Sequence, residues 1–251
     1  MATEQTAPAE RRAPVAPGRH APVDRTGVRS VYVWEWPVRI THWVIVAAII
    51  ALSFTGWWLH APFFGPSAPA GPGASPGFTL GIMRFLHELA AVAFVAALLG
   101  RMYWAVAGNR YARFTALLPL TPQQRQGLRE TLAYYALRRG PPRAIGHNPL
   151  AGISYIVLWL GFWLSILTGL SLFTWIVDRE PWTTLFGWTW SVMAIQNIRL
   201  VHFLLMFAFM AFAVHHVYSA VLVDFEERNG ELSSIVTGWK LDYGEDEEDD
   251  V

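Results

Sequence analysis

The stretch RLVHFLLMFAFMAFAVHHVY, residues 199–218, is apolar enough to lie in a lipid bilayer, yet it contains three histidines. An imidazole within hydrocarbon is costly and usually has a function. His202 and His216 are fourteen residues apart, which is close to four turns of an α-helix. Their side chains therefore share one helix face and lie about 21 Å apart along the axis. This spacing predicts two sites on one helix, at opposite depths of the same membrane.

The composition favours a membrane protein. Of 251 residues, 53% are hydrophobic and 15% are charged, and thirteen are tryptophan. This composition is more hydrophobic and less charged than that of a typical soluble globular protein. The formal net charge is zero and indicates no particular partner. The absence of cysteine excludes disulfides, cysteine-held iron–sulfur clusters and thioether-attached haem. Any metal must therefore be held by histidine, by carboxylates or by a bound cofactor.

Four apolar stretches are long enough to span a bilayer, which takes about 20 residues. They lie at about 40–59, 82–106, 151–175 and 200–223. We therefore predict an all-α integral membrane protein, a four-helix transmembrane bundle, within residues 30–240. Residues 1–29 lack an apolar run, so we expect a disordered tail and not a signal peptide. Residues 241–251 form an acidic tail.

The arginines predict the orientation of the spans. Many lie between the second and third spans, while the segment between the first and second has only Arg84. Those of the rich segment are Arg101, Arg110, Arg113, Arg125, Arg129, Arg138, Arg139 and Arg143. Because Lys and Arg stay on the cytoplasmic side, we expect both termini to be cytoplasmic and the chain to cross the inner membrane. Residues 63–77 and 178–197 then face outward, and the tryptophan-rich second segment is either an interfacial helix or a docking surface.

Two further histidines match the first two in depth. His42 follows Arg39 at the cytoplasmic end of the first span, and His87 comes early in the second span, which starts outside. His42 and His216 therefore form an inner pair, and His87 and His202 form an outer pair. Two imidazoles on facing helices with apolar surroundings are the ligand set of haem b iron. We predict two such haems, stacked across the membrane as an electron path.

Other interpretations of these residues stay open. Each histidine can instead be a hydrogen-bonded polar residue at a helix contact, and a zinc or proton-relay site would need a carboxylate, for which Glu88 is the candidate. Gly56, Gly100 and Gly169 either let a flat macrocycle approach the backbone or serve ordinary helix contact. His215 points about 100° away from His216 and is expected to be a hydrogen-bond partner rather than a ligand.

Several motifs together resemble the b-type cytochrome subunit of membrane-bound nickel–iron hydrogenases. They are VYVWEWPVRITHW (31–43), GIMRFLHELAA (81–91), GRMYWAVAGNRYAR (100–113), IGHNPLA (145–151), LTGLSLF (167–173), HHVYSAVLVDF (215–225) and SSIVTGWK (233–240). The resemblance implies a four-helix protein with two haems b whose iron ligands fall on His42, His87, His202 and His216. It also implies electron transfer from a periplasmic hydrogenase, through its iron–sulfur small subunit, to membrane quinone. The chain would then be an electron-transfer component without catalytic residues of its own.

One departure from the family leaves the catalytic partner open. Members can carry an additional histidine just before the last span, where this chain reads NIRLVHFLL with only His202. The alternatives are the membrane cytochrome b subunit of a formate dehydrogenase, or a free-standing quinone reductase similar to cytochrome b561. A haem-free membrane anchor or transporter is a third possibility, which the absorbance of the purified protein would test.

A quinone site is expected at the start of the third span. Asn148 can hydrogen-bond a quinone carbonyl and His147 can relay a proton, although Asn148-Pro149 is also an ordinary helix-start signal. Electrons are expected to enter at the outer pair, where aromatic residues offer contacts to a partner that brings its own cluster. These aromatic residues are Phe63, Phe64, Trp182, Trp188 and Trp190.

Overall fold

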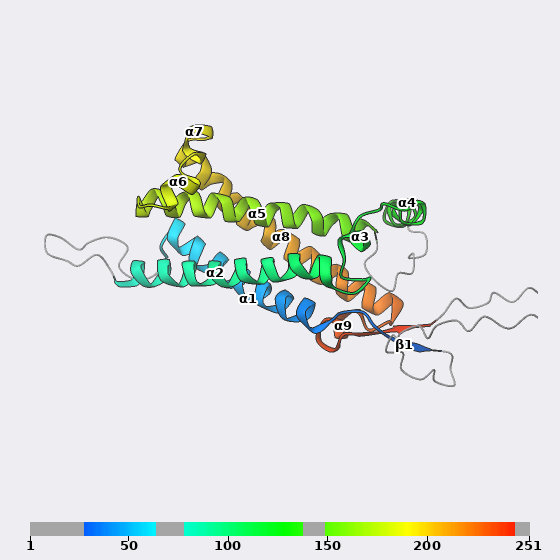
Figure 1. Cartoon of the computed structure of the whole chain (residues 1–251). Helices are drawn as coiled ribbons and strands as arrows, with labels where there is room; N and C mark the ends of the chain where they lie inside the picture. The colour runs from blue at the N-terminus through cyan, green and yellow to red at the C-terminus, as the bar shows by residue number, and fades with distance from the viewer. Residues whose placement is uncertain (1–27, 64–77, 138–148, 244–251) are drawn as a thin grey trace, which may run out of the picture.

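Four long helices run side by side in the computed structural model (Figure 1). The structure describes residues 28–63, 78–137 and 149–243. The long helices are α1 (Trp36–His60), α2 (Phe78–Ala107), α5 (Pro149–Val177) and α8 (Ile195–Glu227), and each is long and apolar enough to cross a membrane. They confirm the four predicted spans, and each extends beyond the predicted bounds. Few of their apolar side chains are buried and many are exposed, as expected for helices whose outer faces contact lipid.

Side chains from all four long helices meet in one layer at mid-length. Ala48 of α1 packs with Phe94 and Leu98 of α2 and with Phe162 of α5, and all four are buried. The Phe162 ring lies edge-on to Phe94 and also contacts Phe209 of α8, at 5.0 Å between ring centres in both cases. This apolar layer, here called the middle layer, holds the two helical hairpins together.

The two ends of the bundle are covered differently (Figure 1). One end carries α6 (Trp182–Phe186) and α7 (Thr189–Val192), and the other carries α3 (Phe114–Leu117), α4 (Pro122–Leu137) and α9 (Glu231–Thr237). At the second end, Gly152 of α5 packs against α3 so closely that a Cβ atom would lie 2.3 Å from the Leu117 carbonyl oxygen. This contact requires glycine, and it fixes the start of α5 against the α2–α5 connection.

A small antiparallel sheet closes that second end, and the all-α prediction missed it. Strand β1 (Arg29–Tyr32) pairs with β2 (Trp239–Asp242), with Tyr32 opposite Trp239. Just before β2, Gly238 has φ of +90°, and its carbonyl accepts hydrogen bonds from the backbone N–H groups of Val33 and Trp34 at 2.8 and 3.1 Å. Four-residue strands have no periodicity long enough to stand out from the adjoining helices, so the sequence pattern did not reveal them.

Glu35 connects this sheet to the loop after α2. Its side chain does not cap α1. Instead, Oε2 accepts hydrogen bonds from Trp104 Nε1 and from the backbone N–H of Asn109, both at 2.8 Å. The Asn109 amide also donates to the Val33 carbonyl at 2.9 Å. Two of the motifs, at 31–43 and 100–113, therefore share one hydrogen-bonded junction.

Five tryptophans of the long helices have different roles in the fold. They are Trp43, Trp57, Trp58, Trp104 and Trp175, and of these Trp58 is only 1% exposed. Trp175 lies edge-on to Trp190 at 5.0 Å between ring centres, and Trp190 Nε1 donates to Ser171 Oγ at 3.2 Å. These contacts anchor the segment of α6 and α7 on the end of α5. Trp58 is therefore a packing residue, while Trp57 and Trp175 keep exposed faces.

Candidate functional site

The four candidate histidines lie in two facing pairs. In the outer pair, the ring centres of His87 on α2 and His202 on α8 are 6.4 Å apart. In the inner pair, the ring centres of His42 on α1 and His216 on α8 are 6.3 Å apart. The structure thus brings the residues together in the pairs predicted from their depths. Their binding of haem iron stays a prediction.

The spacing of each pair fits one metal ion between the two rings. A metal–imidazole bond is about 2.0 Å long, and a ring centre lies about 1.1 Å beyond its nitrogen, so two ligands in line have ring centres about 6.2 Å apart. Both measured separations agree with this value. The rings are inclined by 57° and 66°, so neither pair is stacked. The residues present therefore fit a bis-histidine haem at each depth.

Two threonines set the orientation of the outer imidazoles. Thr55 Oγ1 lies 2.8 Å from His87 Nδ1, and Thr168 Oγ1 lies 2.9 Å from His202 Nδ1. Each hydroxyl already donates its one hydrogen to the carbonyl four residues earlier, at 2.7 and 2.8 Å. The hydroxyl oxygen must therefore accept from Nδ1–H. This fixes the tautomer in which Nε2 keeps its lone pair for a metal.

The inner imidazoles are held less firmly. Tyr155 of α5 places its hydroxyl 3.4 Å from His216 Nδ1, and the Phe212 ring stacks on His216 at 5.7 Å between centres. His42 Nδ1 is buried and has no hydrogen-bond partner in the described structure. In the described structure, three of the four histidines therefore have a partner for the second ring nitrogen. The exception leaves the orientation of His42 to packing alone.

Two of the noted glycines make room for the outer imidazoles. A Cβ atom on Gly56 would lie 3.3 Å from His87 Cε1, and one on Gly169 would lie 3.1 Å from His202 Cε1. A Cβ atom on Gly100 would instead meet Thr41 of α1 at 3.4 Å. In the described structure, Gly56 and Gly169 therefore serve close approach of a histidine ring, and Gly100 serves a helix contact.

The threonines were not identified from the sequence, although a signal was present. Thr55-Gly56 and Thr168-Gly169 are the same dipeptide, once on α1 and once on α5. In each case threonine bonds the histidine of the following long helix and glycine makes room for it. A Thr-Gly dipeptide near the end of one span, together with a histidine near the start of the next, is the pattern that predicts such a threonine–histidine contact.

The rival metal and proton-relay interpretations have little support in the geometry. Glu88, the candidate carboxylate, is exposed, while the neighbouring His87 points toward the outer pair. Within residues 28–63, 78–137 and 149–243, no three His, Cys, Asp or Glu side chains form a metal-binding group. His215 is also exposed and belongs to neither pair. Of the residues assigned to quinone and partner contacts, His147, Asn148 and Phe64 lie outside the described residues.

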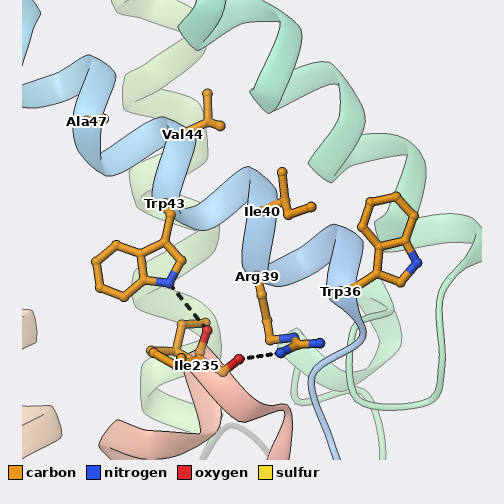
Figure 2. A pocket seen from close by; sticks show the side chains of 8 residues that line it. Trp36, Arg39, Ile40, Trp43, Val44, Ala47 and Ile235 are labelled. Carbon is orange, nitrogen blue, oxygen red and sulfur yellow. Dashed lines mark hydrogen bonds between the residues drawn. The ribbon is translucent and has the colours of Figure 1, made fainter.

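A surface groove lies beside the inner pair without including it (Figure 2). It has a volume of about 530 Å³ and lies between α1 and α9. Its lining residues are Trp36, Arg39, Ile40, Trp43, Val44, Ala47, Ile235 and Val236. Trp43 donates from Nε1 to the Ile235 carbonyl at 3.4 Å, and Arg39 donates to the Val236 carbonyl. Trp43 is also in edge contact with His42, at 5.2 Å between ring centres.

Four membrane helices with facing histidine pairs at two depths are the architecture of a membrane b-type cytochrome. A family model described as prokaryotic cytochrome b561 matches residues 33–238. The chain belongs to the prokaryotic cytochrome b561 family.

Several similar proteins carry a more specific name. A "Probable Ni/Fe-hydrogenase B-type cytochrome subunit" of Cupriavidus necator is 34% identical over 218 residues, which cover 85% of this chain and 88% of that protein. A protein of the same name from Rhodobacter capsulatus is 36% identical over 214 residues, covering 83% and 80%. The "Probable Ni/Fe-hydrogenase 1 B-type cytochrome subunit" of Escherichia coli is 32% identical over 223 residues, covering 85% and 92%. These matches confirm the resemblance predicted from the motifs.

The threonine contacts lead to a prediction about the outer site. Thr55→Val and Thr168→Val keep the side-chain shape but remove the hydroxyl that accepts from a histidine Nδ1–H. We expect each variant to lower the affinity of the outer site for haem by about 10- to 100-fold, as seen when such supporting hydrogen bonds are lost. Haem retained against a competing apoprotein measures this loss. Thr174→Val is the control, because Thr174 is buried and its hydroxyl donates to the Leu170 carbonyl of its own helix. Equal losses in all three variants would contradict a specific role.

Proposed function

We propose that this chain is the membrane cytochrome b that carries electrons from a periplasmic nickel–iron hydrogenase to membrane quinone. Two haems b, one at each histidine pair, form the path. The observation that carries this proposal is the presence of two facing pairs, at separations of 6.3 and 6.4 Å, on opposite sides of an apolar layer. The names of the similar proteins support the hydrogenase as the donor.

The protein's own residues position and insulate the two sites. Each haem iron, when bound, accepts and returns one electron. Thr55 and Thr168 hold the outer imidazoles in the ligating tautomer, and Tyr155 contacts an inner one. Phe94, Phe162 and the rest of the middle layer keep water out between the two depths. Histidines 14 residues apart on α8 hold the sites about 21 Å apart along the helix axis.

Electrons enter at the outer pair, on the side covered by α6 and α7. Trp182 and Trp188 are exposed there, with 36% and 53% of their surface accessible, and Phe63 at the end of α1 is 59% exposed. Such aromatic residues suit the iron–sulfur small subunit as a partner. Glu180 adds an anionic group, because hydrogen bonds from Thr183 and then Thr184 lower the pKa of its carboxyl. This surface faces the periplasm if both termini are cytoplasmic, as the arginine distribution indicates.

Hydrogen oxidation through this chain should build a membrane potential. Electrons entering outside and reaching a quinone that takes its protons from the cytoplasm move charge across the membrane. The complex with its co-purified partner would be reconstituted in sealed, oriented vesicles, supplied with hydrogen and quinone, and followed with a voltage-sensitive dye. We expect quinone reduction and a potential together. Rapid reduction without a potential would mean that both half-reactions exchange protons on one side, and the quinone site would have to lie beside the outer pair.

The quinone site is proposed at the start of α5, close in depth to the inner pair. We expect Asn148→Ala and His147→Ala to slow quinone reduction by about 5- to 150-fold with haem content unchanged, because a lost hydrogen bond to a buried polar group costs about 1–3 kcal/mol. Steady-state reduction of a soluble quinone analogue measures the effect. Unchanged rates in both variants would exclude this location. The groove between α1 and α9 would then be the second candidate, since it opens on the apolar face of α1 beside His42.

Isolation of the intact complex distinguishes the hydrogenase partner from the two alternatives. A formate dehydrogenase partner, or no catalytic partner at all, would replace the hydrogenase in the co-purifying material. A haem-free anchor or transporter would show no Soret absorbance. The hydrogenase assignment predicts nickel and iron in the purified complex, together with two haems b per chain.

A further inference from the structure

Arg101, which the orientation argument counted with the arginines after the second span, lies within α2 and is buried. Its role is not part of the proposed electron path. Its side chain is 8% exposed. Both terminal nitrogens donate to the Ala112 carbonyl, each at 3.2 Å, and the guanidinium carbon lies 5.1 Å from the centre of the Trp159 ring. No carboxylate forms an ion pair with it in the part of the chain that the structure describes. Among these described residues, no anion compensates its positive charge.

The depth of Arg101 equals that of the inner pair. Arg101 follows His87 by fourteen residues on α2, just as His216 follows His202 by fourteen on α8. Both helices run in the same direction from the outer pair, so Arg101 and His216 lie equally far from it, about 21 Å. The same spacing keeps Arg101 within about 40° of the helix face that carries His87.

Contacts with two other helices support this depth. On α1, Thr41 precedes His42 and touches Gly100, the residue before Arg101. On α5, Trp159 lies one turn after Tyr155, whose hydroxyl contacts His216. The residue before Arg101 therefore meets the residue before His42, and the Arg101 guanidinium meets a residue one turn from the Tyr155 that contacts His216.

A charge at this depth needs a reason. Arginine in a membrane span is costly, and such residues mark functional sites. A single carbonyl and one aromatic face use only part of the five N–H donors of a guanidinium. The planar group is suited to bind a carboxylate through two hydrogen bonds. The remaining donors at the level of the inner pair thus define a binding site for an anion.

We propose that Arg101 binds a propionate carboxylate of the haem held by His42 and His216, and that its charge sets this haem at a higher midpoint potential than the outer one. The inference rests on the proposed function. Reduction adds an electron to the haem, and a nearby positive charge stabilises the reduced form. Electron transfer from the outer to the inner site is then energetically downhill.

Redox titration of the full complex tests this role without depending on turnover. Arg101→Gln removes the charge and keeps the side-chain length, whereas Arg101→Lys keeps the charge. Arg110→Gln is the matched control, because Arg110 is exposed at the same end of the bundle. We expect Arg101→Gln to lower the potential of one haem component only, Arg101→Lys to lower it less, and Arg110→Gln to change neither. In a His87→Ala background, which should hold only the inner haem, the remaining component should show the same shift.

The alternative outcomes are distinct. Absence of haem from the unaltered protein would refute the proposed function itself. Two normal haems with unchanged potentials in both Arg101 variants, or a shift of the outer component, would overturn the role of Arg101. A loss of quinone reduction at unchanged potentials would assign the cation to the quinone instead, and the inference would be wrong. If Arg101→Gln does not assemble, Arg101→Lys still tests the potential. The redox-difference infrared spectrum of the unaltered, ¹⁵N-arginine-labelled protein gives a second test. The absence of a redox-linked change in its arginine bands would overturn the role of Arg101.

Discussion

Replacing His87 with Ala should remove one of two haems and leave the other in place. His87 faces His202 at 6.4 Å between ring centres, and alanine offers the iron no ligand in its place. His42 and His216 lie on the other side of the middle layer and keep their own contacts. We expect half the haem per chain, one remaining redox component and a loss of hydrogen-driven quinone reduction of at least 100-fold. The pyridine haemochrome assay and optical redox titration measure the first two quantities.

His215→Ala is the matched control for this prediction. His215 lies on α8 beside His216 but is exposed and belongs to neither pair, so its variant should retain both haems. The reciprocal variant His216→Ala should remove the inner haem and retain the outer one. Full occupancy of both sites in His87→Ala would show that the assigned pairs are not the ligands.

The sequence was sufficient to predict the spans and the pairing of the histidines. Long apolar stretches need no tertiary information, since length and hydropathy define them. The pairs followed from depth, because the arginine distribution set the direction of each helix and each histidine then had a position along it. His42, His87, His202 and His216 could thus be grouped before any contact was known.

The partners of the imidazoles required the structure. Depth shows which residues lie level with one another but not which face of a neighbouring helix they meet. Thr55 and Thr168 stand out in the sequence only as parts of a repeated Thr-Gly dipeptide, and the structure was needed to place their hydroxyls beside His87 and His202. Within the described part of the chain, His42 Nδ1 has no hydrogen-bond partner, and this too is a property of packing, since no local pattern encodes it.

The packing of α9, β1 and β2 at one end of the bundle also could not be predicted from the sequence. Glu35 and Asn109 are far apart in the chain, and their junction depends on how β1 meets the loop after α2. Lys240 lies just before the acidic tail in the sequence, yet its side chain is 1% exposed. Burial of a charge close to the chain end arises only once both strands and α9 have packed together.

Loss of the Glu231 carboxylate should destabilise the packing of α9 and the two strands more than loss of its partner Lys240. Lys240 Nζ forms an ion pair with Glu231 Oε2, and the lysine also lies 5.7 Å from the centre of the Trp34 ring. The lysine side chain is 1% exposed and the glutamate 28%. Removing Glu231 therefore leaves a buried, unpaired cation, which costs about 3–5 kcal/mol. Removing Lys240 leaves a carboxylate that water can still reach.

We expect Glu231→Leu to lower the free energy of unfolding by about 3–5 kcal/mol and the melting temperature by about 10 °C. Lys240→Met should cost about 1–2 kcal/mol, and the double variant Glu231→Leu with Lys240→Met should recover most of the loss because no unpaired charge remains buried. Thermal unfolding of the detergent-solubilised protein, followed by circular dichroism and haem absorbance, gives all three values.

Glu130→Leu on α4 is the control, since its hydrogen bond to Gln126 is exposed and the change should stay within about 0.5 kcal/mol. Because α9 and β1 lie against the start of α1, the inner haem should be lost before the outer one in Glu231→Leu. Equal effects of the two single variants, or no recovery in the double variant, would mean that the pair acts through packing rather than through charge.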